Sequence, residues 1–317
     1  MIRRFFSFAA ILFFLTHAAP ETFAQGCCTV GASSLGGLES GVQPTHTFSL
    51  AVSYQSNSVT QAYQGTEKIA DPLRRTADVR YLTVQAEYGL MNGLSVLGSI
   101  NYSDKTRELT VTTGSGSSKT EQTAAFRGNG IGDLIVLVKY SVLQPTIPQP
   151  TGIALGVGAS LPTGSFTEVQ NSSQLSIDLQ PGTGAPAILG WLFVSHGFPE
   201  RGLQFLLTST YRYAGTNFDG YRLGDEILAT VIAEKSITEN YAGFVALRSR
   251  FAQKDFANRR FLIGTGGTYY DFMPGIAYRE GRSSLKLFGQ LPLYRNVRGI
   301  QLTPAYMFGL QFTHQLG

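Results

Sequence analysis

Residues 285–294 read LKLFGQLPLY and residues 304–313 read PAYMFGLQFT, and these two runs decide the fold. In each run an apolar side chain occupies every second position, as at Leu285 and Leu287 or at Phe308 and Leu310. This two-residue period is typical of a β-strand with one continuous apolar face. The face carries no charge and is rich in aromatic residues in the second run, which suits a surface that contacts lipid. A soluble sandwich also alternates in this way, so the rest of the chain must distinguish the two.

The composition favours a β-rich chain with many turns. Among 317 residues there are 36 glycines, 21 phenylalanines and 15 tyrosines, against one tryptophan. Glycine-rich turns and aromatic belts are features of membrane barrels. Only 15% of the residues are charged, which is low for a soluble surface. The net charge of +4 is small and its Lys and Arg residues are scattered, so we expect no nucleic-acid partner.

The first residues have the features of an export signal. Arg3 and Arg4 precede an apolar core at residues 5–15, and the small-residue motif TFA at 22–24 offers a cleavage site. Residues 1–24 are therefore predicted to be a cleaved signal peptide. No later segment reaches the ~18 consecutive apolar residues of a transmembrane helix. After export, the chain is predicted to be either soluble or a β-barrel.

Residues 25–44 are glycine-rich and follow neither a helix nor a strand period. We expect this segment to be a periplasmic tail or a plug that folds into the lumen. Its Cys27 and Cys28 are the only cysteines, and adjacent cysteines cannot form a disulfide framework. Lipidation of Cys27, a vicinal disulfide, a metal contact and an inert tail remain open for the pair.

The strand pattern repeats along the chain, with short and long connections in alternation. A tight hairpin at residues 91–93 (MNG) joins two strands, whereas polar stretches at 56–78, 104–128 and 163–181 separate others. Strands of roughly ten residues with alternating loop lengths are the layout of an outer-membrane barrel. Closure of the barrel leaves no unpaired sheet edge in lipid. The sequence therefore predicts an all-β fold, a closed antiparallel up-and-down transmembrane barrel of about 12 strands over residues 45–317.

Every second residue along these strands is assigned to the inner face, and these residues are a mixture of charged, apolar and aromatic side chains. Acids and bases are nearly balanced there, so we expect ion pairs across the lumen and not a ring of one sign. Such pairs either form a gate or simply make the interior rigid. The apolar and aromatic inner residues suit the passage of a small apolar solute, or a narrow barrel packed with its own side chains. The predicted lumen residues are Asp133, Lys139, Arg212, Glu226, Phe244, Arg248, Arg250, Tyr269, Asp271, Phe288 and Tyr294.

Residues for catalysis or metal binding do not cluster in the sequence. Outside the signal, the histidines are His46, His196 and His314, and each falls at a strand end or turn on the predicted periplasmic side. A hydrolase needs a Ser, a His and an orienting group within reach of one another. No Cys, His and carboxylate residues share a ligand spacing. We therefore expect no enzyme activity, no metal and no cofactor.

Several motifs over residues 130–316 stand out. They are GIGD at 130–133 ahead of Lys139 and Tyr140, ASLPTG at 159–164, LQPGTG at 179–184, Gly266 and Gly267 with Pro274, Gly275 and Tyr278, and QLPLY at 290–294 with Gly299 and QLT at 301–303. In these motifs the chain resembles the outer-membrane barrels grouped with the meta-pathway of phenol degradation. That resemblance implies a barrel in the outer membrane of a Gram-negative bacterium and passage of small hydrophobic or aromatic compounds.

The final strand departs from the usual assembly signal, because Phe312 is followed by THQLG at 313–317 and not by a terminal aromatic residue. Gly309 and Phe312 still resemble that signal. The expected partners are outer-membrane lipid, the barrel assembly machinery through this strand, and a small apolar solute. The alternative function is a structural or adhesin-type barrel that acts through external loops, of which residues 106–123 are a low-complexity example.

Overall fold

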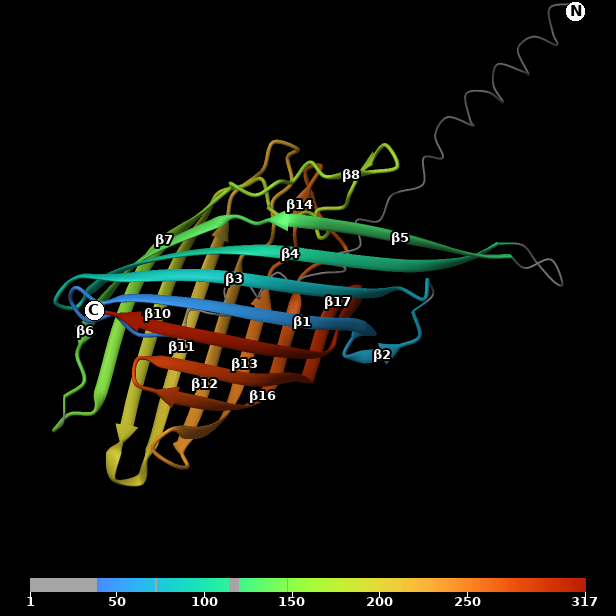
Figure 1. Ribbon diagram of the computed structural model, residues 1–317. Helices are drawn as coiled ribbons and strands as arrows, with labels where there is room; N and C mark the ends of the chain where they lie inside the picture. Colours follow the sequence, from blue (N-terminus) through green and yellow to red (C-terminus); the bar gives the residue numbers. More distant parts are fainter. Residues whose placement is uncertain (1–38, 72, 114–119, 147) are drawn as a thin grey trace, which may run out of the picture.

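The computed structural model describes residues 39–317, apart from residues 72, 114–119 and 147. These residues form a closed antiparallel β-barrel with the strands wrapped around one lumen (Figure 1). The predicted fold class is confirmed. The expected signal peptide, Cys27, Cys28 and residues 25–38 of the glycine-rich segment lie outside the described residues. No helix in the described part of the chain is long and apolar enough to cross a membrane.

The elements follow one another along the chain with strands of very different length. In order they are β1 (Phe48–Gly65), β2 (Glu67–Ile69), β3 (Thr76–Met91), β4 (Leu94–Thr113), β5 (Thr120–Ile131), β6 (Leu134–Leu143), β7 (Thr151–Leu161), β8 (Val169–Gln170), β9 (Ser173–Gln174), β10 (Ala187–Phe198), the 3-10 helix η3 (Pro199–Arg201), β11 (Leu203–Ala214), β12 (Glu226–Ser236), β13 (Tyr241–Ala252), β14 (Phe256–Ala257), β15 (Arg260–Phe261), β16 (Gly267–Glu280) and β17 (Ser283–Leu316).

The ring closes because β1 pairs with the end of β17, with Phe48 opposite Leu316. The 34 residues of β17 would span roughly 110 Å as one straight strand. They instead make two passes: residues 283–297 pair with β16 and residues 300–316 pair with β1. The reversal lies at Gly299, whose φ of 73° is in the left-handed region that favours glycine. Eleven labelled strands therefore cross the barrel twelve times, an even number as an antiparallel ring requires.

Short and long connections alternate between the two ends of the barrel, as predicted. We call the end that carries the C-terminus the turn end, and the opposite end the loop end (Figure 1). At the turn end, residues 92–93 join β3 to β4 and residues 281–282 join β16 to β17. At the loop end, residues 162–186 join β7 to β10 and residues 253–266 join β13 to β16. We call residues 162–186 the roof loop.

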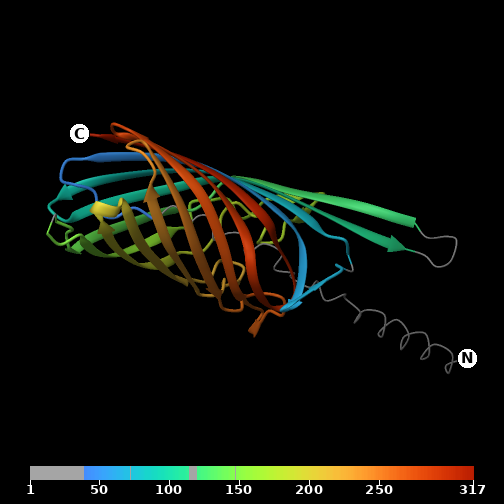
Figure 2. The same cartoon turned by 90° about the horizontal axis from the view of Figure 1, so that it is seen from below.

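The predicted polar loop at residues 104–128 is wrong, because these residues extend two paired strands. β4 pairs with β5 from Tyr102 opposite Ile131 to Thr113 opposite Thr120. Threonine and valine both favour strands, even in a segment with few large apolar residues. The polar composition of residues 104–128 therefore made these strands resemble a loop. β4 and β5 form a hairpin that projects past the other strands at the loop end (Figures 1 and 2).

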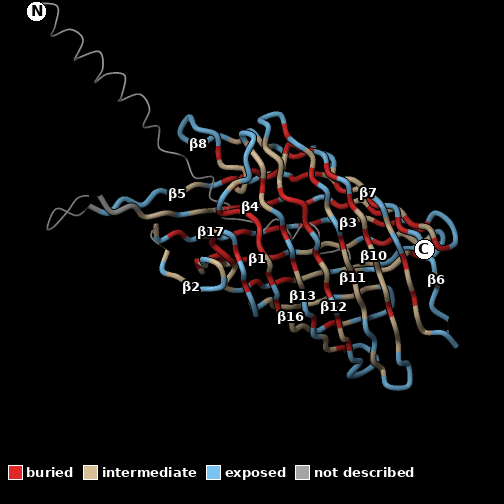
Figure 3. Tube along the Cα trace, turned by 180° about the vertical axis from the view of Figure 1, so that it is seen from behind, coloured by how far each residue is buried: buried red, intermediate tan, exposed pale blue. Residues whose placement is uncertain are grey.

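Burial alternates along the strands, so one face looks outward and the other into the lumen (Figure 3). In β3 the exposed Leu82 and Tyr88 alternate with the buried Tyr81 and Glu87. Outward aromatic residues gather near both ends of the barrel, as the aromatic girdles of a membrane barrel do. The exposed aromatic residues near the ends include Tyr88, Tyr140, Phe205 and Tyr241 at the turn end, and Tyr211, Tyr213, Phe251, Tyr270 and Tyr294 at the loop end.

Candidate functional site

The candidate site is the lumen. Ten of the eleven predicted lumen residues are buried or half-buried on the inner face. They are Asp133, Lys139, Arg212, Glu226, Phe244, Arg248, Arg250, Tyr269, Asp271 and Phe288. Most of the charged members form ion pairs within this face. Asp133 instead accepts hydrogen bonds from the roof loop, and Arg248 pairs with Glu39 before β1. Most of these pairs join neighbouring or nearly neighbouring strands, so the lumen is not bridged from wall to wall in the way that the sequence suggested.

The prediction is wrong for Tyr294, whose side chain lies outside the lumen with 42% of the residue exposed. The register between β16 and β17 shifts by one residue between Pro292 and Tyr294, which is a β-bulge. The extra residue reverses the parity, so Tyr294 packs beside Tyr270 at a ring distance of 5.7 Å. Arg295 points inward instead and pairs with Asp271. Strict alternation would have put the Arg295 charge in lipid, and that cost was the signal that could have revealed the bulge.

Near the loop end, Glu226 joins two arginines into a group that we call the Glu226 triad. Arg250 donates to Glu226 Oε2 through Nε and Nη2, at 3.0 and 2.8 Å. Arg212 Nη2 lies 3.6 Å from the same oxygen. Because β11, β12 and β13 are neighbours, register alone brings the three residues together. The Arg250 guanidinium also lies over the Tyr269 ring, 5.0 Å from its centre.

Asp133 ties the roof loop to the barrel wall. It sits between β5 and β6 and accepts hydrogen bonds from the Gly164 N–H and from both the N–H and the hydroxyl of Thr183. Lys105 on β4 donates to the carbonyl of Gln180, which is itself buried. The roof loop therefore folds inward over the lumen, with several of its polar atoms bonded to the wall. Sequence reasoning missed this role because the loop showed no period.

Near the turn end, Lys139 is fully buried and pairs with Glu87 at 3.0 Å. Its ammonium also donates to the carbonyls of Ser40 and Gly41, at 3.0 and 3.3 Å. The same ammonium lies 4.8 Å from the centre of the Trp191 ring. One lysine on the wall thus holds the backbone of the segment that precedes β1.

A second contact reaches the same segment from another strand. Arg248 on β13 lies 3.4 Å from the Glu39 carboxylate. A polar cavity of about 210 Å³ lies beside this contact, lined in part by Glu39, Ser40 and Gln43. Residues 39–43 therefore occupy part of the lumen at the turn end.

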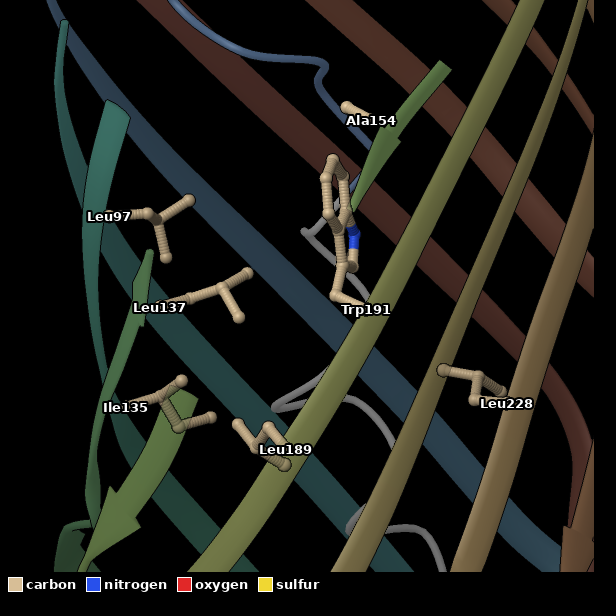
Figure 4. Close-up of a cluster of buried hydrophobic side chains, with 7 residues drawn as sticks. All are labelled: Leu97, Ile135, Leu137, Ala154, Leu189, Trp191 and Leu228. Atoms are coloured by element: carbon tan, nitrogen blue, oxygen red, sulfur yellow. The ribbon is translucent and has the colours of Figure 1, made fainter. Parts of the chain in front are cut away.

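Two apolar clusters line parts of the inner face, among buried polar residues such as Gln85, Ser99 and Thr230. One cluster contains Leu97, Leu137 and Trp191, which reach from β4, β6 and β10 into the same space (Figure 4). Ile135, Ala154, Leu189 and Leu228 complete it. A second cluster on the opposite strands is made of Ile232, Ala246, Met273 and Met307, with Leu206, Phe244 and Phe288 packed against it.

Trp191 provides a spectroscopic test of this arrangement, because it is the sole tryptophan and is 3% exposed. We expect acrylamide to quench its fluorescence weakly in the folded protein and strongly after unfolding. The indole stacks on the Phe193 ring, with 5.8 Å between the ring centres, and the Lys139 ammonium lies over it. These contacts keep the indole away from bulk water. Equal quenching of the folded and unfolded protein would contradict a packed inner face at this level.

The histidines lie at the turn end, as predicted, and each bonds to a hydroxyl. The partners of His46, His196 and His314 are Tyr88, Thr151 and Ser283. Within the described residues, none of these histidines bonds to a carboxylate, and no group of His, Cys, Asp and Glu side chains could hold a metal ion.

No protein-family model and no curated protein sequence matches the chain. Several solved structures match it. The COG4313 outer membrane channel from Pseudomonas putida F1 matches with a TM-score of 0.65 and 13% identity, over 87% of this chain and 97% of that one. The translocator domain of the autotransporter NalP from Neisseria meningitidis has a TM-score of 0.45 and 11% identity, over 89% and 92%. A Pseudomonas aeruginosa FadL homologue has a TM-score of 0.42 and 8% identity, over 85% and 90%.

The fold and the inner face together define the class. The chain has the fold of a Gram-negative outer-membrane β-barrel, with aromatic girdles outside and its charges paired inside. In such barrels the short turns face the periplasm and the long loops face outward. The turn end is therefore the periplasmic end, and the roof loop lies at the extracellular end.

Proposed function

We propose that the barrel is a channel for small hydrophobic or aromatic molecules across the outer membrane. The observation that carries this proposal is the presence of two apolar clusters on the inner face, the Trp191 cluster and the cluster around Met273. A general porin keeps a polar, water-filled interior. Apolar patches in the lining instead lower the free energy of an apolar solute along its path.

Two further observations support the proposal. The lumen contains cavities at both ends, one of about 130 Å³ under the roof loop and one of about 210 Å³ at the periplasmic end. The Pseudomonas putida protein that shares the fold is described as an outer membrane channel. The resemblance to the meta-pathway barrels implies solutes of the same class.

We also propose that residues 25–44 act as a plug at the periplasmic end. The contacts that support this are those of Lys139 with Ser40 and Gly41 and of Arg248 with Glu39. A buried ion pair that also binds a backbone segment holds that segment in one place. The plug makes passage conditional on its displacement.

One observation favours the alternative of an adhesin-type barrel. The β4–β5 hairpin projects beyond the other strands at the extracellular end (Figure 2). Its two paired strands place an extended surface outside the barrel, where an external partner can reach it. In this alternative the barrel is an anchor and no solute crosses it.

Uptake of radiolabelled toluene by intact cells separates the two functions, because the lipopolysaccharide leaflet slows apolar solutes. We expect expression of the protein to raise the uptake rate. Ala246→Trp, on the inner face, should return uptake to background because the indole fills the lumen beside Met273 and Met307. Val245→Trp, the neighbouring residue on the exposed outer face, should leave uptake high. If expression changes the uptake of neither toluene nor a polar solute such as arabinose, the channel function is wrong.

A further inference from the structure

The outer wall of the barrel carries an apolar groove near the periplasmic end, which we call the outer groove. It crosses β11, β12, β13, β16 and both passes of β17, and its volume is about 750 Å³. Its sides are aliphatic and aromatic, and they include Leu203, Val245, Ile276, Leu287 and Phe308. These residues alternate with inner-face residues along their strands, so they belong to the lipid-facing side of the barrel.

The outer groove exists because two outward positions lack a side chain. Gly243 on β13 and Gly289 on β17 lie on the outer face, among residues with large side chains. A Cβ added at Gly289 would meet its nearest atom outside the adjoining residues at 3.8 Å, and one at Gly243 would do so at 3.5 Å. Both distances are ordinary contacts, so the space outside the two glycines is free.

Two aromatic rings close the floor between the outer groove and the lumen. Pro274 has no N–H to donate, and the ladder between β16 and β17 is interrupted beside it. Phe244 and Phe288, whose side chains come from the inner face, line the outer groove at this level. A Cβ added at the adjoining Gly275 would overlap the Phe244 ring, so this ring covers the backbone there. The outer groove can therefore hold a chain along its length without opening into the lumen.

The depth of the outer groove matches one leaflet of a bilayer. It extends from the turn end of the strands to Pro274, which lies six residues before Glu280 at the end of β16. Six strand residues span about 20 Å, and a tilt of about 40° reduces the rise to about 15 Å. The hydrocarbon core is about 30 Å thick, so each leaflet contributes about 15 Å. One acyl chain of the periplasmic leaflet therefore fits the outer groove from end to end.

Lys235 places a positive charge at the periplasmic mouth of the outer groove. Of the described residues that line the outer groove, only Lys235 is charged. Its ammonium donates to the carbonyl of Arg201. An ammonium has three N–H donors, so two remain for a ligand. Glu200 and Glu239 lie in the neighbouring turns but do not line the outer groove. An anionic head group at the membrane surface therefore complements this mouth.

We propose that the outer groove binds an anionic phospholipid of the periplasmic leaflet. One acyl chain lies over Gly243 and Gly289, between Val245 and Leu287, and the phosphate group accepts hydrogen bonds from Lys235. This lipid lies outside the barrel and is distinct from any solute in the lumen. The inference is therefore independent of the channel function.

Quenching of tryptophan fluorescence by brominated lipids tests the site in the full-length protein. Phe308→Trp puts a reporter in the outer groove, and Val157→Trp puts one at an exposed position on β7, outside it. Each variant is reconstituted in phosphatidylcholine with brominated chains, and unbrominated phosphatidylglycerol competes for contact with the reporter. The emission of Trp191, measured in the unmodified protein, is subtracted.

We expect phosphatidylglycerol to be preferred about fivefold over phosphatidylcholine at the Phe308→Trp reporter, the contribution of one lysine near an anionic head group. At the Val157→Trp reporter, the two lipids should compete in proportion to their amounts. An equal preference at the two reporters would overturn the proposal.

Variants of charge show whether Lys235 provides the preference. Lys235→Met, combined with the Phe308→Trp reporter, should reduce the preference to about one. Arg282→Met is the matched control, because it removes an exposed charge from another turn at the same end without touching the outer groove. It should keep the fivefold preference. A preference that survives in Lys235→Met would overturn the assigned contact with the phosphate.

Gly289→Phe tests the occupant, because the new ring fills the free space of the outer groove. It should abolish the preference for phosphatidylglycerol with Lys235 still present, and it should leave toluene uptake by cells as in the unmodified protein. A retained preference would show that no chain lies over Gly289 and would overturn the proposal. A loss of uptake would show that the solute occupies the outer groove, and it would also overturn the proposal.

Discussion

Deletion of residues 26–41 is expected to raise the single-channel conductance of the purified protein in a planar bilayer several-fold. The reason lies at the periplasmic end of the lumen, where Lys139 binds the carbonyls of Ser40 and Gly41 and Arg248 contacts Glu39. Removal of the segment leaves the cavity of about 210 Å³ continuous with the space that residues 39–41 occupy. The charged wall left behind favours entry of hydrated ions.

A double variant tests the same plug without shortening the chain. Lys139→Met/Glu87→Leu removes both partners of the buried ion pair, so no lone charge stays buried. We expect the conductance to rise, or to fluctuate between levels as the segment leaves the lumen and returns to it. Lys68→Met, at an exposed position on β2, is the matched control and should conduct like the unmodified protein. Unchanged conductance in the deletion variant, with the barrel folded, would refute the plug.

Glu226→Ala is expected to lower the free energy of unfolding by about 3–5 kcal/mol, the range for breaking a buried ion pair from one side. The substitution leaves Arg250 without its charge partner, although the two arginines remain on neighbouring inner positions. Refolding from urea into detergent, followed by the shift of the folded barrel on unheated gels, measures the change.

Glu234→Ala is the matched control, because Glu234 lies on the same strand and the same face. Its partner Arg279 has 43% of its side chain exposed and can return to water when the pair is broken. Because the remaining Arg279 charge is hydrated after the substitution, we expect a loss of about 1 kcal/mol, near the range for exposed pairs. Equal losses for the two variants would show that burial of the Glu226 triad does not set its cost.

The alternation of side chains along each strand explains most of the predictions that could be made about the lumen. The period of two assigned ten of eleven lumen residues to the inner face, because a barrel wall has only two sides. It failed at Tyr294, since a bulge inserts one residue and reverses every position until the next irregularity. It also failed for residues 104–128, whose polar threonines extend β4 and β5 beyond the barrel.

The two-residue period of the strands could not predict contacts between residues that are far apart in the sequence. Lys139 and Glu87 are 52 residues apart and meet only because β3, β4 and β6 stand side by side in one register. The roof loop has no period of its own, and its inward course depends on Asp133 and Lys105 in the wall beneath it.

The sequence by itself determined a closed barrel with a lipid-facing side, an inner side and alternating loop lengths, because strand period and turn residues are local properties of the chain. The tertiary structure alone decided which charges pair, which loop enters the lumen and what residues 39–41 touch. Those features depend on the register and closure of the ring, which bring together residues that no local pattern connects.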